Sequence, residues 1–491
     1  MTKQEDWVAL VTGGASGIGQ ESTSQRKTKP LGTHIMIGAE VKNHSSRKKR
    51  LADVKRFPSS FYRAPWAFLV VSAMVALSGI SAWAHSIPLF HLALTSRTSR
   101  NAAPLIVGYF PEWGLYYPKP YYVKALVTSG AAGRLNQINY AEASVRNGRC
   151  SLSDPKADLN ATYSADISVN GKADDPRSPF RGYFHQLQEL KHRYPRLKIL
   201  ISLEGKASDF AEDARAENRQ AFVASCVDTF LRGHFAPGVS RPGIFDGIDV
   251  DWESPQQEDA ENFLALLEEF RRQMNGVRRD VRLSVAVGAS PQMLPGTDFA
   301  VVAKLVDEVG VMNYDYAGPW NTTTGFVAPL CTNPSAPRDY SSNIEQSIDS
   351  YKAAGVAATK LLMGLPFYGY GWTDVEKSNN GLFQPGHGVG DDQPYHSIRA
   401  FAPPFVAYRD ERSQAPWLYD GDTFWTYEDP VSVRFKSSYA AHEKLAGVMI
   451  WELSGDTGDA ELLNAAYRSL HHPSDASAFA EAATEKPAAA E

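Results

Sequence analysis

Cysteine is scarce in this chain, which has three cysteines among 491 residues. Cys150, Cys226 and Cys331 are too few to form a disulfide framework. In an exported protein one pair could form and would leave the third thiol free. The alternative is that the cysteines are small buried hydrophobic residues, above all Cys226, which lies in the helical pattern of residues 221–227.

The chain also lacks a basic surplus over most of its length. Residues 1–65 contain 12 Lys and Arg against 5 Asp and Glu, a net of +7, so the remaining residues carry 38 against 50, a net of −12. Nucleic acid requires a basic surface, so we expect no nucleic-acid partner for this acidic body. The basic residues between 47 and 63 could be a nuclear-targeting patch, but their position directly before an apolar run favours export.

That apolar run extends from Trp66 to Ile80 and is followed by Ser81-Ala82-Trp83-Ala84. Positive charge, an apolar stretch and an Ala-x-Ala site are typical of a secretory signal peptide. We therefore predict a signal peptide at residues 66–84, cleavage before His85, and a secreted protein. The alternative is an uncleaved membrane anchor with the body facing outside, because the run approaches the ~20 residues that span a bilayer.

Residues 8–19 resemble the first strand and glycine-rich turn of a short-chain dehydrogenase. Neither an amphipathic helix nor a second strand follows Gln20, so a dinucleotide fold has no room and we expect no nucleotide to bind. We predict that residues 1–65 are a disordered basic leader that looks foreign to the rest of the chain, with Met36 as an alternative start. The tail at residues 473–491, rich in Ala, Glu and Ser, is also predicted to be disordered.

Four carboxylates stand within residues 246–253, in a run otherwise suited to a buried strand. Strand alternation would place Asp249, Asp251 and Glu253 on one face, about 6.5 Å apart. Carboxylates so close and so buried must share protons, which raises the pKa of one and leaves another ionised. A neutral acid beside an anionic carboxylate is suited to cleaving an acetal.

A solvated acidic face and a calcium loop are the alternative readings of this run. The apolar residues Ile248, Val250 and Trp252 between the acids argue against a solvated face. The spacing lacks the glycine and the terminal glutamate of a calcium-binding loop. We therefore expect no metal at this site.

The body from residue 103 to 472 alternates short apolar strands with amphipathic helices, which predicts an α/β fold. The helices include residues 217–231 and 259–274. Eight βα units predict a (β/α)8 TIM barrel with its catalytic groups at the carboxyl ends of the strands, where Glu253 would lie. A long connection between strands seven and eight contains further short β-like runs, so we predict a small α+β insertion at residues 373–445. The strands begin near Leu105, Gln137, Ile199, Gly247, Arg282, Val309, Leu361 and Gly447.

Four segments in order resemble glycoside hydrolase family 18, the chitinase family. Residues 245–253 resemble its D-x-x-D-x-D-x-E motif, residues 312–315 its M-x-Y-D segment, residues 364–369 its G-x-P-x-Y-G strand, and residues 447–451 its last strand with a closing tryptophan. The resemblance spans residues 103–472. It implies a TIM barrel, and the insertion is similar to the one found in one branch of the chitinases.

Glu253, the last of the carboxylates in residues 246–253, is our candidate general acid. By spacing alone Asp251 would be a nucleophile, as in a standard retaining glycosidase. The resemblance implies instead that the 2-acetamido oxygen of the substrate attacks the anomeric carbon while Asp251 orients that group. It further implies that Asp249 shares a proton with Asp251, and that Tyr314 contacts the acetamido group.

The remaining candidates would bind sugar or support the site. The resemblance implies that Trp451 forms the floor beneath the sugar, and apolar sugar faces stack on aromatic rings. Asp246 has the opposite strand parity, so a buried supporting role and a direct role both stay open. Asp315 should bind sugar hydroxyls, and Met312 is a further candidate for substrate binding. Four aromatic residues are also candidates, each with packing as the alternative: Tyr109, Trp113, Tyr368 and Trp320.

Two positions depart from the family pattern. Strand three usually ends in S-x-G-G, whereas this chain has Ser202-Leu203-Glu204-Gly205-Lys206, and strand two commonly carries phenylalanine where this chain has Glu142. Both changes add an acidic group near the barrel mouth, which leaves the catalytic set complete but changes the expected aglycone subsites.

These observations predict a chitinase that hydrolyses β-1,4-linked N-acetylglucosamine polymers or oligomers as a monomer, without metal or cofactor. The resemblance implies a retaining, substrate-assisted mechanism. An endo-β-N-acetylglucosaminidase acting on glycans is the alternative enzyme. A non-catalytic chitin-binding lectin is the alternative from another class, and the presence of Glu253 argues against it.

Overall fold

The computed structural model describes residues 103–401 and 403–471. The predicted leader at residues 1–65, the signal peptide or anchor at residues 66–84 and the tail at residues 473–491 lie outside these ranges. Within the described part of the chain, no helix combines the length and apolar character that a membrane span requires.

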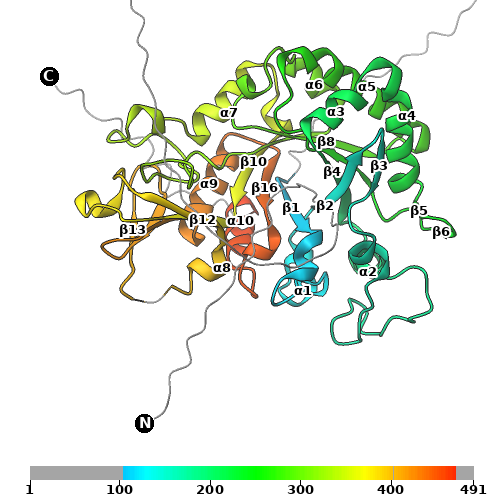
Figure 1. The fold of residues 1–491 in the computed structure, drawn as a ribbon, viewed down its shortest axis with the longest axis horizontal. Helices are drawn as coiled ribbons and strands as arrows, with labels where there is room; N and C mark the ends of the chain where they lie inside the picture. The colour runs from blue at the N-terminus through cyan, green and yellow to red at the C-terminus, as the bar shows by residue number, and fades with distance from the viewer. Residues whose placement is uncertain (1–102, 402, 472–491) are drawn as a thin grey trace, which may run out of the picture. The chain divides into compact units, whose positions relative to one another are not determined.

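A closed barrel of parallel strands forms the body, as Figure 1 shows. The strand order is β1-β16-β10-β9-β8-β7-β4-β2, and pairing of β1 with β2 closes the ring. Each strand starts at or next to its predicted position, which confirms the TIM barrel. The strands are β1 Leu105–Pro111, β2 Gln137–Arg146, β4 Lys198–Glu204, β7 Gly247–Val250, β8 Arg282–Val287, β9 Glu308–Val311, β10 Leu361–Pro366 and β16 Gly447–Trp451.

Helices and smaller strands connect the barrel strands. The predicted helix at residues 217–231 is α4 followed by a single π turn at Val227–Leu231, and the one at residues 259–274 is α5. Strand β3 (Arg149–Leu152) pairs antiparallel with β2, and β5 (His234–Ala236) pairs with β6 (Val239–Ser240). The helices of the barrel are α1 Lys124–Thr128, α2 Gly182–Arg193, α3 Ala207–Asp213, α4 Ala216–Cys226, α5 Ala260–Val277, α6 Phe299–Leu305, α7 Ile344–Ala353, α9 Pro430–His442 and α10 Glu461–His471.

Between β10 and β16 the chain forms a separate antiparallel sheet in the order β12-β11-β15-β14-β13, together with α8 (Tyr395–Ile398). It has its own buried core, which includes Trp372, Trp417 and Phe424. The strands are β11 Tyr368–Thr373, β12 His387–Pro394, β13 Val406–Arg409, β14 Pro416–Tyr419 and β15 Phe424–Thr426.

The limits of this insertion differ from the expected 373–445 at both ends. The sheet already begins at Tyr368, one residue after Phe367, which follows β10. At the other end, α9 packs against α10 and β16 and not within the sheet. The reason is local, because Asp429 caps the backbone N–H groups of Val431 and Ser432, and Pro430 starts a new helix there.

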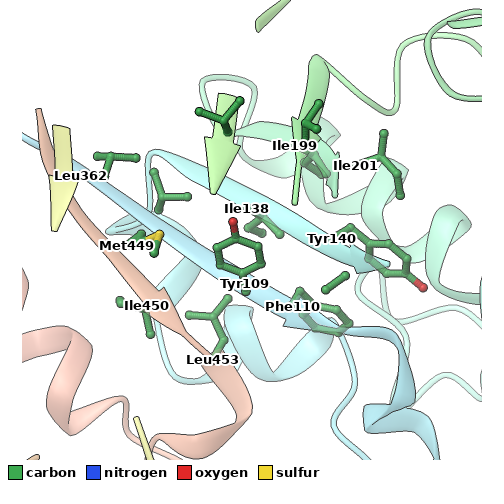
Figure 2. Packing of buried hydrophobic residues seen from close by; sticks show 14 of the residues in the cluster. Tyr109, Phe110, Ile138, Tyr140, Ile199, Ile201, Leu362, Met449, Ile450 and Leu453 are labelled. Atoms are coloured by element: carbon green, nitrogen blue, oxygen red, sulfur yellow. The ribbon is translucent and has the colours of Figure 1, made fainter. Parts of the chain in front are cut away.

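Successive side chains on β1 point to opposite sides of the strand, one into the barrel interior and one into the layer between strands and helices (Figure 2). Tyr109 points inward and its phenol oxygen reaches Asp249. Phe110 points outward, where its ring stacks on Tyr140 of β2 and meets the edge of Tyr183 in α2. Both aromatic side chains are buried, so the strand has no solvent face and reads as a continuous apolar run.

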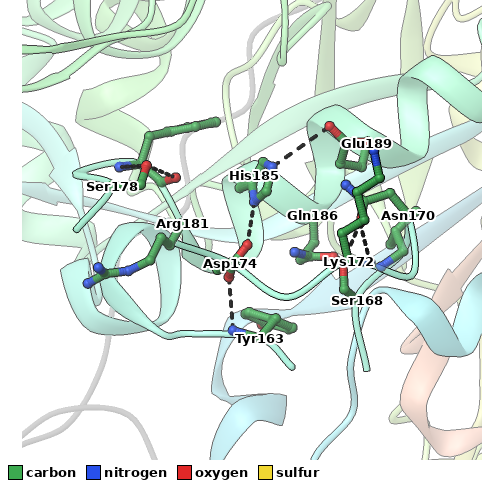
Figure 3. A network of polar contacts seen from close by, with 12 residues as sticks. Tyr163, Ser168, Asn170, Lys172, Asp174, Ser178, Arg181, His185, Gln186 and Glu189 are labelled. Carbon is green, nitrogen blue, oxygen red and sulfur yellow. Dashed lines mark hydrogen bonds and ion pairs between the residues drawn. The ribbon is translucent and has the colours of Figure 1, made fainter. Parts of the chain in front are cut away.

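The long segment between β3 and α2 is tied down by polar contacts (Figure 3). Asp174 accepts hydrogen bonds from the backbone N–H of Tyr163 at 2.8 Å and contacts His185 Nδ1 of α2 at 2.8 Å. Gln186, also in α2, accepts one from the backbone N–H of Val169 at 2.8 Å. These contacts hold an otherwise irregular segment against α2.

Cys150 of β3 and Cys226 at the end of α4 form a disulfide, and Cys331 is a free thiol. The arrangement matches the expectation that one pair could form and leave one thiol. Cys226 is also fully buried, so the two sequence readings of this residue are compatible.

Candidate active site

Asp249 lies inside the barrel and is held by three hydroxyl groups. The strand register places Ser202 of β4 and Ser284 of β8 level with it on either side. The hydroxyls of Tyr109, Ser202 and Ser284 donate hydrogen bonds to its carboxylate at 2.7, 2.9 and 2.5 Å. Burial raises the pKa of Asp249, and these hydrogen bonds act against the rise.

Asp251 follows directly after β7 and is 7% exposed. Its backbone N–H donates to the carbonyl of Leu203 at 3.1 Å, whereas its Oδ1 is buried without a hydrogen-bond partner. Burial raises the pKa of Asp251 well above its usual range, and the charges of Glu253, Asp249 and Glu204 add to the rise. Asp251 therefore holds a proton strongly in the free protein.

Glu253 is more exposed than the two aspartates and borders the open end of the barrel. Loss of solvent around its carboxyl raises its pKa, and the negative charges of Glu204 and Asp315 raise it further. A carboxyl group that keeps its proton and remains accessible is suited to act as a general acid. The regular strand ends at Val250, so Asp249 is the only one of the three acids that lies in β7. The three acids are nevertheless close in space, because the charges of Glu253 and Asp249 both raise the pKa of Asp251.

Tyr314 and Asp315 follow β9 at the same end of the barrel. Tyr314 is 9% exposed, and burial followed by the charge of Asp251 raises its pKa well above the usual range. Its ring meets the ring of Tyr368 edge-on at 6.0 Å. Tyr368 donates a hydrogen bond to Asp315 Oδ1 at 2.6 Å, so these two predicted residues are in direct contact. Met312, half-buried, packs against the barrel core.

Three predicted aromatic residues meet at the mouth. The half-buried ring of Trp451, at the end of β16, lies 5.2 Å from the ring of Tyr109 and 6.1 Å from that of Trp113. Tyr109 is only 3% exposed and bonded to Asp249, so it supports the carboxylate beneath the open surface. Trp320 is 59% exposed and packs on Tyr370 of the insertion, at 5.3 Å between ring centres.

Asp246 lies at the opposite end of β7 and has cationic partners. Its carboxylate accepts hydrogen bonds from Lys191 Nζ at 2.7 Å, the backbone N–H of Ile199 at 3.0 Å and Arg278 at 3.2 Å. It is 5% exposed. Of the two readings left open by the sequence, this placement favours structural support.

Glu142 and Glu204, the two departures from the family pattern, meet at the mouth. Glu204 ends β4, and its carboxyl is hydrogen bonded to that of Glu142 from β2. Burial, followed by the hydrogen bond and the charge of Glu142, raises the pKa of Glu204 to about 8. Lys206 is exposed and precedes the first turn of α3.

Sequence reasoning missed four polar residues of the site. Ser202 and Ser284 are single hydroxyl residues within apolar strands, and that interruption was the available signal. Glu452 follows Trp451, and burial raises its pKa to about 7 while Ser454 and Tyr117 hydrogen bond to it. Asp392 of β12 adds negative charge near Glu452. Among the described residues, no cluster of three or more His, Cys, Asp or Glu side chains could hold a metal ion.

The family model of glycosyl hydrolases family 18 matches residues 105–456. Chitinase C of Streptomyces lividans is 33% identical over 378 residues, covering 74% of this chain and 59% of that protein. Chitinase 63 of Streptomyces plicatus is 32% identical, covering 74% of this chain and 60% of that protein. The chain thus spans about 60% of the length of these curated relatives.

Among solved structures, the catalytic domain of psychrophilic chitinase B from Arthrobacter TAD20 is 30% identical, with a TM-score of 0.70. The match covers 75% of this chain and 95% of that domain. Chitinase ChiA74 from Bacillus thuringiensis is 28% identical, with a TM-score of 0.64, and the match covers 75% of this chain and 70% of that protein.

Proposed function

The chain belongs to glycosyl hydrolases family 18, and we propose that it is a chitinase that hydrolyses β-1,4-linked N-acetylglucosamine polymers or oligomers. The observation that carries this proposal is the setting of Asp251. Its buried Oδ1 has no hydrogen-bond partner, while Asp249 on one side is held by three hydroxyls and Glu253 on the other remains accessible.

We propose that Glu253 donates its proton to the glycosidic oxygen as the bond from that oxygen to the anomeric carbon breaks. The 2-acetamido oxygen of the same sugar forms a bond to the anomeric carbon from the opposite face. Asp251 accepts a hydrogen bond from the acetamido N–H, which gives the unpartnered Oδ1 a role. Tyr314, whose pKa is raised, keeps its proton and donates to the acetamido group.

In the second step, Glu253 accepts a proton from water, and the water oxygen attacks the anomeric carbon and displaces the acetamido oxygen. Two inversions at this carbon retain the β configuration. Asp249 supports both steps, because its three hydroxyl donors favour its charged form and so favour the proton of the Asp249–Asp251 pair on Asp251. Trp451 offers an aromatic face beneath the sugar.

A defined set of substrates tests this function. Chitin oligomers should be cleaved and a high-mannose glycopeptide should not, with products measured by mass spectrometry. Cleavage of the glycopeptide alone would identify an endo-β-N-acetylglucosaminidase. Binding of chitin oligomers without any cleavage would identify a lectin.

The mechanism has its own test. Fully deacetylated oligomers should resist cleavage, a thiazoline mimic of the cyclic intermediate should inhibit strongly, and the first product seen by NMR should be the β anomer. An α anomer as first product, or a covalent glycosyl ester on Asp251 found by mass spectrometry, would contradict the substrate-assisted route.

We also propose that the protein is exported through residues 66–84. The Cys150–Cys226 disulfide supports this, because disulfides persist in oxidising compartments. The mature protein should begin near His85, which N-terminal sequencing of the secreted product can check. Deleting residues 1–84 should leave activity unchanged, and micromolar NAD or NADP binding to the full chain alone would contradict our interpretation of residues 8–19.

A further inference from the structure

The strand register brings Glu204 beside the catalytic acids. β4 and β7 pair in parallel with Ser202 opposite Asp249 and Leu203 opposite Val250. Beyond these pairs, the backbone N–H of Asp251 donates a hydrogen bond to the carbonyl of Leu203 at 3.1 Å, which continues the same register past the end of β7. Glu204 follows Leu203, so it stands at the mouth at the level of Asp251.

A bulge in β2 supplies the partner of Glu204. Ala141 pairs with Ser202 and Ala143 with Leu203, so Glu142 is the extra residue that has no counterpart in β4. Bulges re-aim side chains at barrel rims. The Ser153 hydroxyl donates to Glu142 Oε1 at 3.3 Å, and the Glu142 and Glu204 carboxyls hydrogen bond to each other.

No cation pairs with this group of carboxylates. Within residues 103–401 and 403–471, none of the ion pairs involves Glu142, Glu204, Asp249, Asp251 or Glu253. The ion pairs found there join other residues. Asp315, which faces Glu253 from the end of β9, is bound by the Tyr368 phenol and not by a cation. Without a cation, the repulsion between the negative charges of these carboxylates is relieved when some of them bind protons. Their pKa values are therefore raised, and the protons are retained to higher pH.

We propose that Glu204 is a positioning residue that keeps the proton on Glu253 in the alkaline range, through the negative charge that Glu204 places at the barrel mouth once it has ionised. This inference rests on the proposed function, in which Glu253 is the general acid. Burial, followed by the hydrogen bond and the charge of Glu142, raises the pKa of Glu204 to about 8, so Glu142 helps to set the pH at which the charge of Glu204 appears.

The charge balance of the pair explains the direction of the effect. Below about pH 8 the Glu204 carboxyl holds its proton and is neutral. When that proton leaves, the negative charge of Glu204 stands at the level of Asp251 and raises the free energy of ionising Glu253. Activity therefore persists at pH values where an isolated glutamic acid would have lost its proton.

Glu204→Gln tests the inference through the pH profile of kcat on a chitin oligomer. The alkaline limb should move to lower pH by about 0.5 to 2 units, the effect of one charge about 6 Å away at an effective dielectric constant of about 80 to 20. Glu142→Gln is the matched control. It should keep the alkaline limb, because Glu204 then ionises at lower pH and its charge remains beside Glu253.

A second substrate separates this role from a purely structural one. A nitrophenyl glycoside has a leaving group that needs little protonation, so its hydrolysis depends less on the proton of Glu253. The alkaline loss in Glu204→Gln should therefore be clear for the oligomer and small for the nitrophenyl glycoside. Glu204→Asp, which keeps the charge, should restore the limb for the oligomer.

An unchanged alkaline limb in Glu204→Gln, or an equal shift for both substrates, would overturn the inference. If Glu204→Gln fails to fold, as judged by its thermal melt, Glu204→Ala takes its place with the same expected shift. If the wild-type protein cleaves neither substrate, the proposed function fails, and that result is distinct from a failure of the role of Glu204.

Discussion

The two ends of strand β7 carry the same kind of side chain in opposite settings. At the base, Asp246 is surrounded by Lys191, Lys198 and Arg278 at 2.7, 3.7 and 3.2 Å. At the mouth, Asp249 has hydroxyl donors and Asp251 has an unpartnered oxygen.

The difference teaches what makes a buried carboxylate structural or reactive. Cations at the base offset the cost of burying the Asp246 carboxylate. Hydroxyls and neighbouring acids at the mouth supply no cation, so the acids there retain protons, and a retained proton is what a general acid needs. Substitutions of these carboxylates or of the side chains that contact them should therefore lower stability at the base of β7 and activity at the mouth.

Glu253→Gln should have the largest effect. The amide keeps the shape of the side chain but cannot donate a proton, so kcat should fall by roughly 10²-fold or more. Steady-state kinetics on chitin oligomers measures the fall, while titration calorimetry should show that oligomer binding is retained. A variant that keeps more than a few per cent of wild-type turnover would contradict the assignment of the acid.

Asp246→Asn should instead lower the free energy of unfolding. Lys191, 17% exposed, would lose its anionic partner, at a cost of about 2 to 4 kcal/mol. Urea denaturation measures the loss, and kcat of the folded protein should stay near the wild-type value. Arg278→Gln is the matched control, because the Arg278 side chain is 38% exposed and its loss should cost less than about 1 kcal/mol. A large fall in kcat with Asp246→Asn would show that the base takes part in catalysis.

Tyr109→Phe should affect activity more moderately. Losing one hydrogen bond to a charged group corresponds to about a tenfold fall in kcat. The bond from Tyr109 lowers the pKa of Asp249, so its removal should move the acid limb of the pH profile to higher pH. Tyr140→Phe is the control, because its phenol donates to Asp158 at 2.6 Å and no hydrogen bond joins it to Asp249. An equal shift of the acid limb in both variants would refute this role of Tyr109.

The smallest effect concerns the pH dependence of stability. The pKa of Glu204 is raised to about 8, so this carboxyl binds more protons in the folded than in the unfolded state between about pH 4.5 and pH 8, and its contribution to stability falls as pH rises through that window. In Glu204→Gln this fall should be shallower. Thermal melts at a series of pH values measure the slope, and an identical slope in wild type and variant would contradict the raised pKa.

Much of the barrel could be predicted from the sequence, because each strand is a short apolar run whose position depends on local pattern. The limits of the insertion could not, since β11 starts one residue after Phe367 and α9 belongs with α10. Hydrophobic pattern does not distinguish a strand that continues a barrel from one that begins a neighbouring sheet.

The sequence determined the chemical composition of the site: three carboxylates at alternate positions in and directly after β7, a tyrosine after β9 and a tryptophan at the end of β16. It could not determine which acid meets a cation and which meets a hydroxyl. Lys191 is 55 residues from its partner Asp246, and Ser284 is 35 residues from its partner Asp249. Nor could it show that a bulge in β2 brings Glu142 against Glu204. Those contacts depend on the closure and register of the barrel, which place strands distant in sequence side by side, and the pKa of each acid depends on what it then faces.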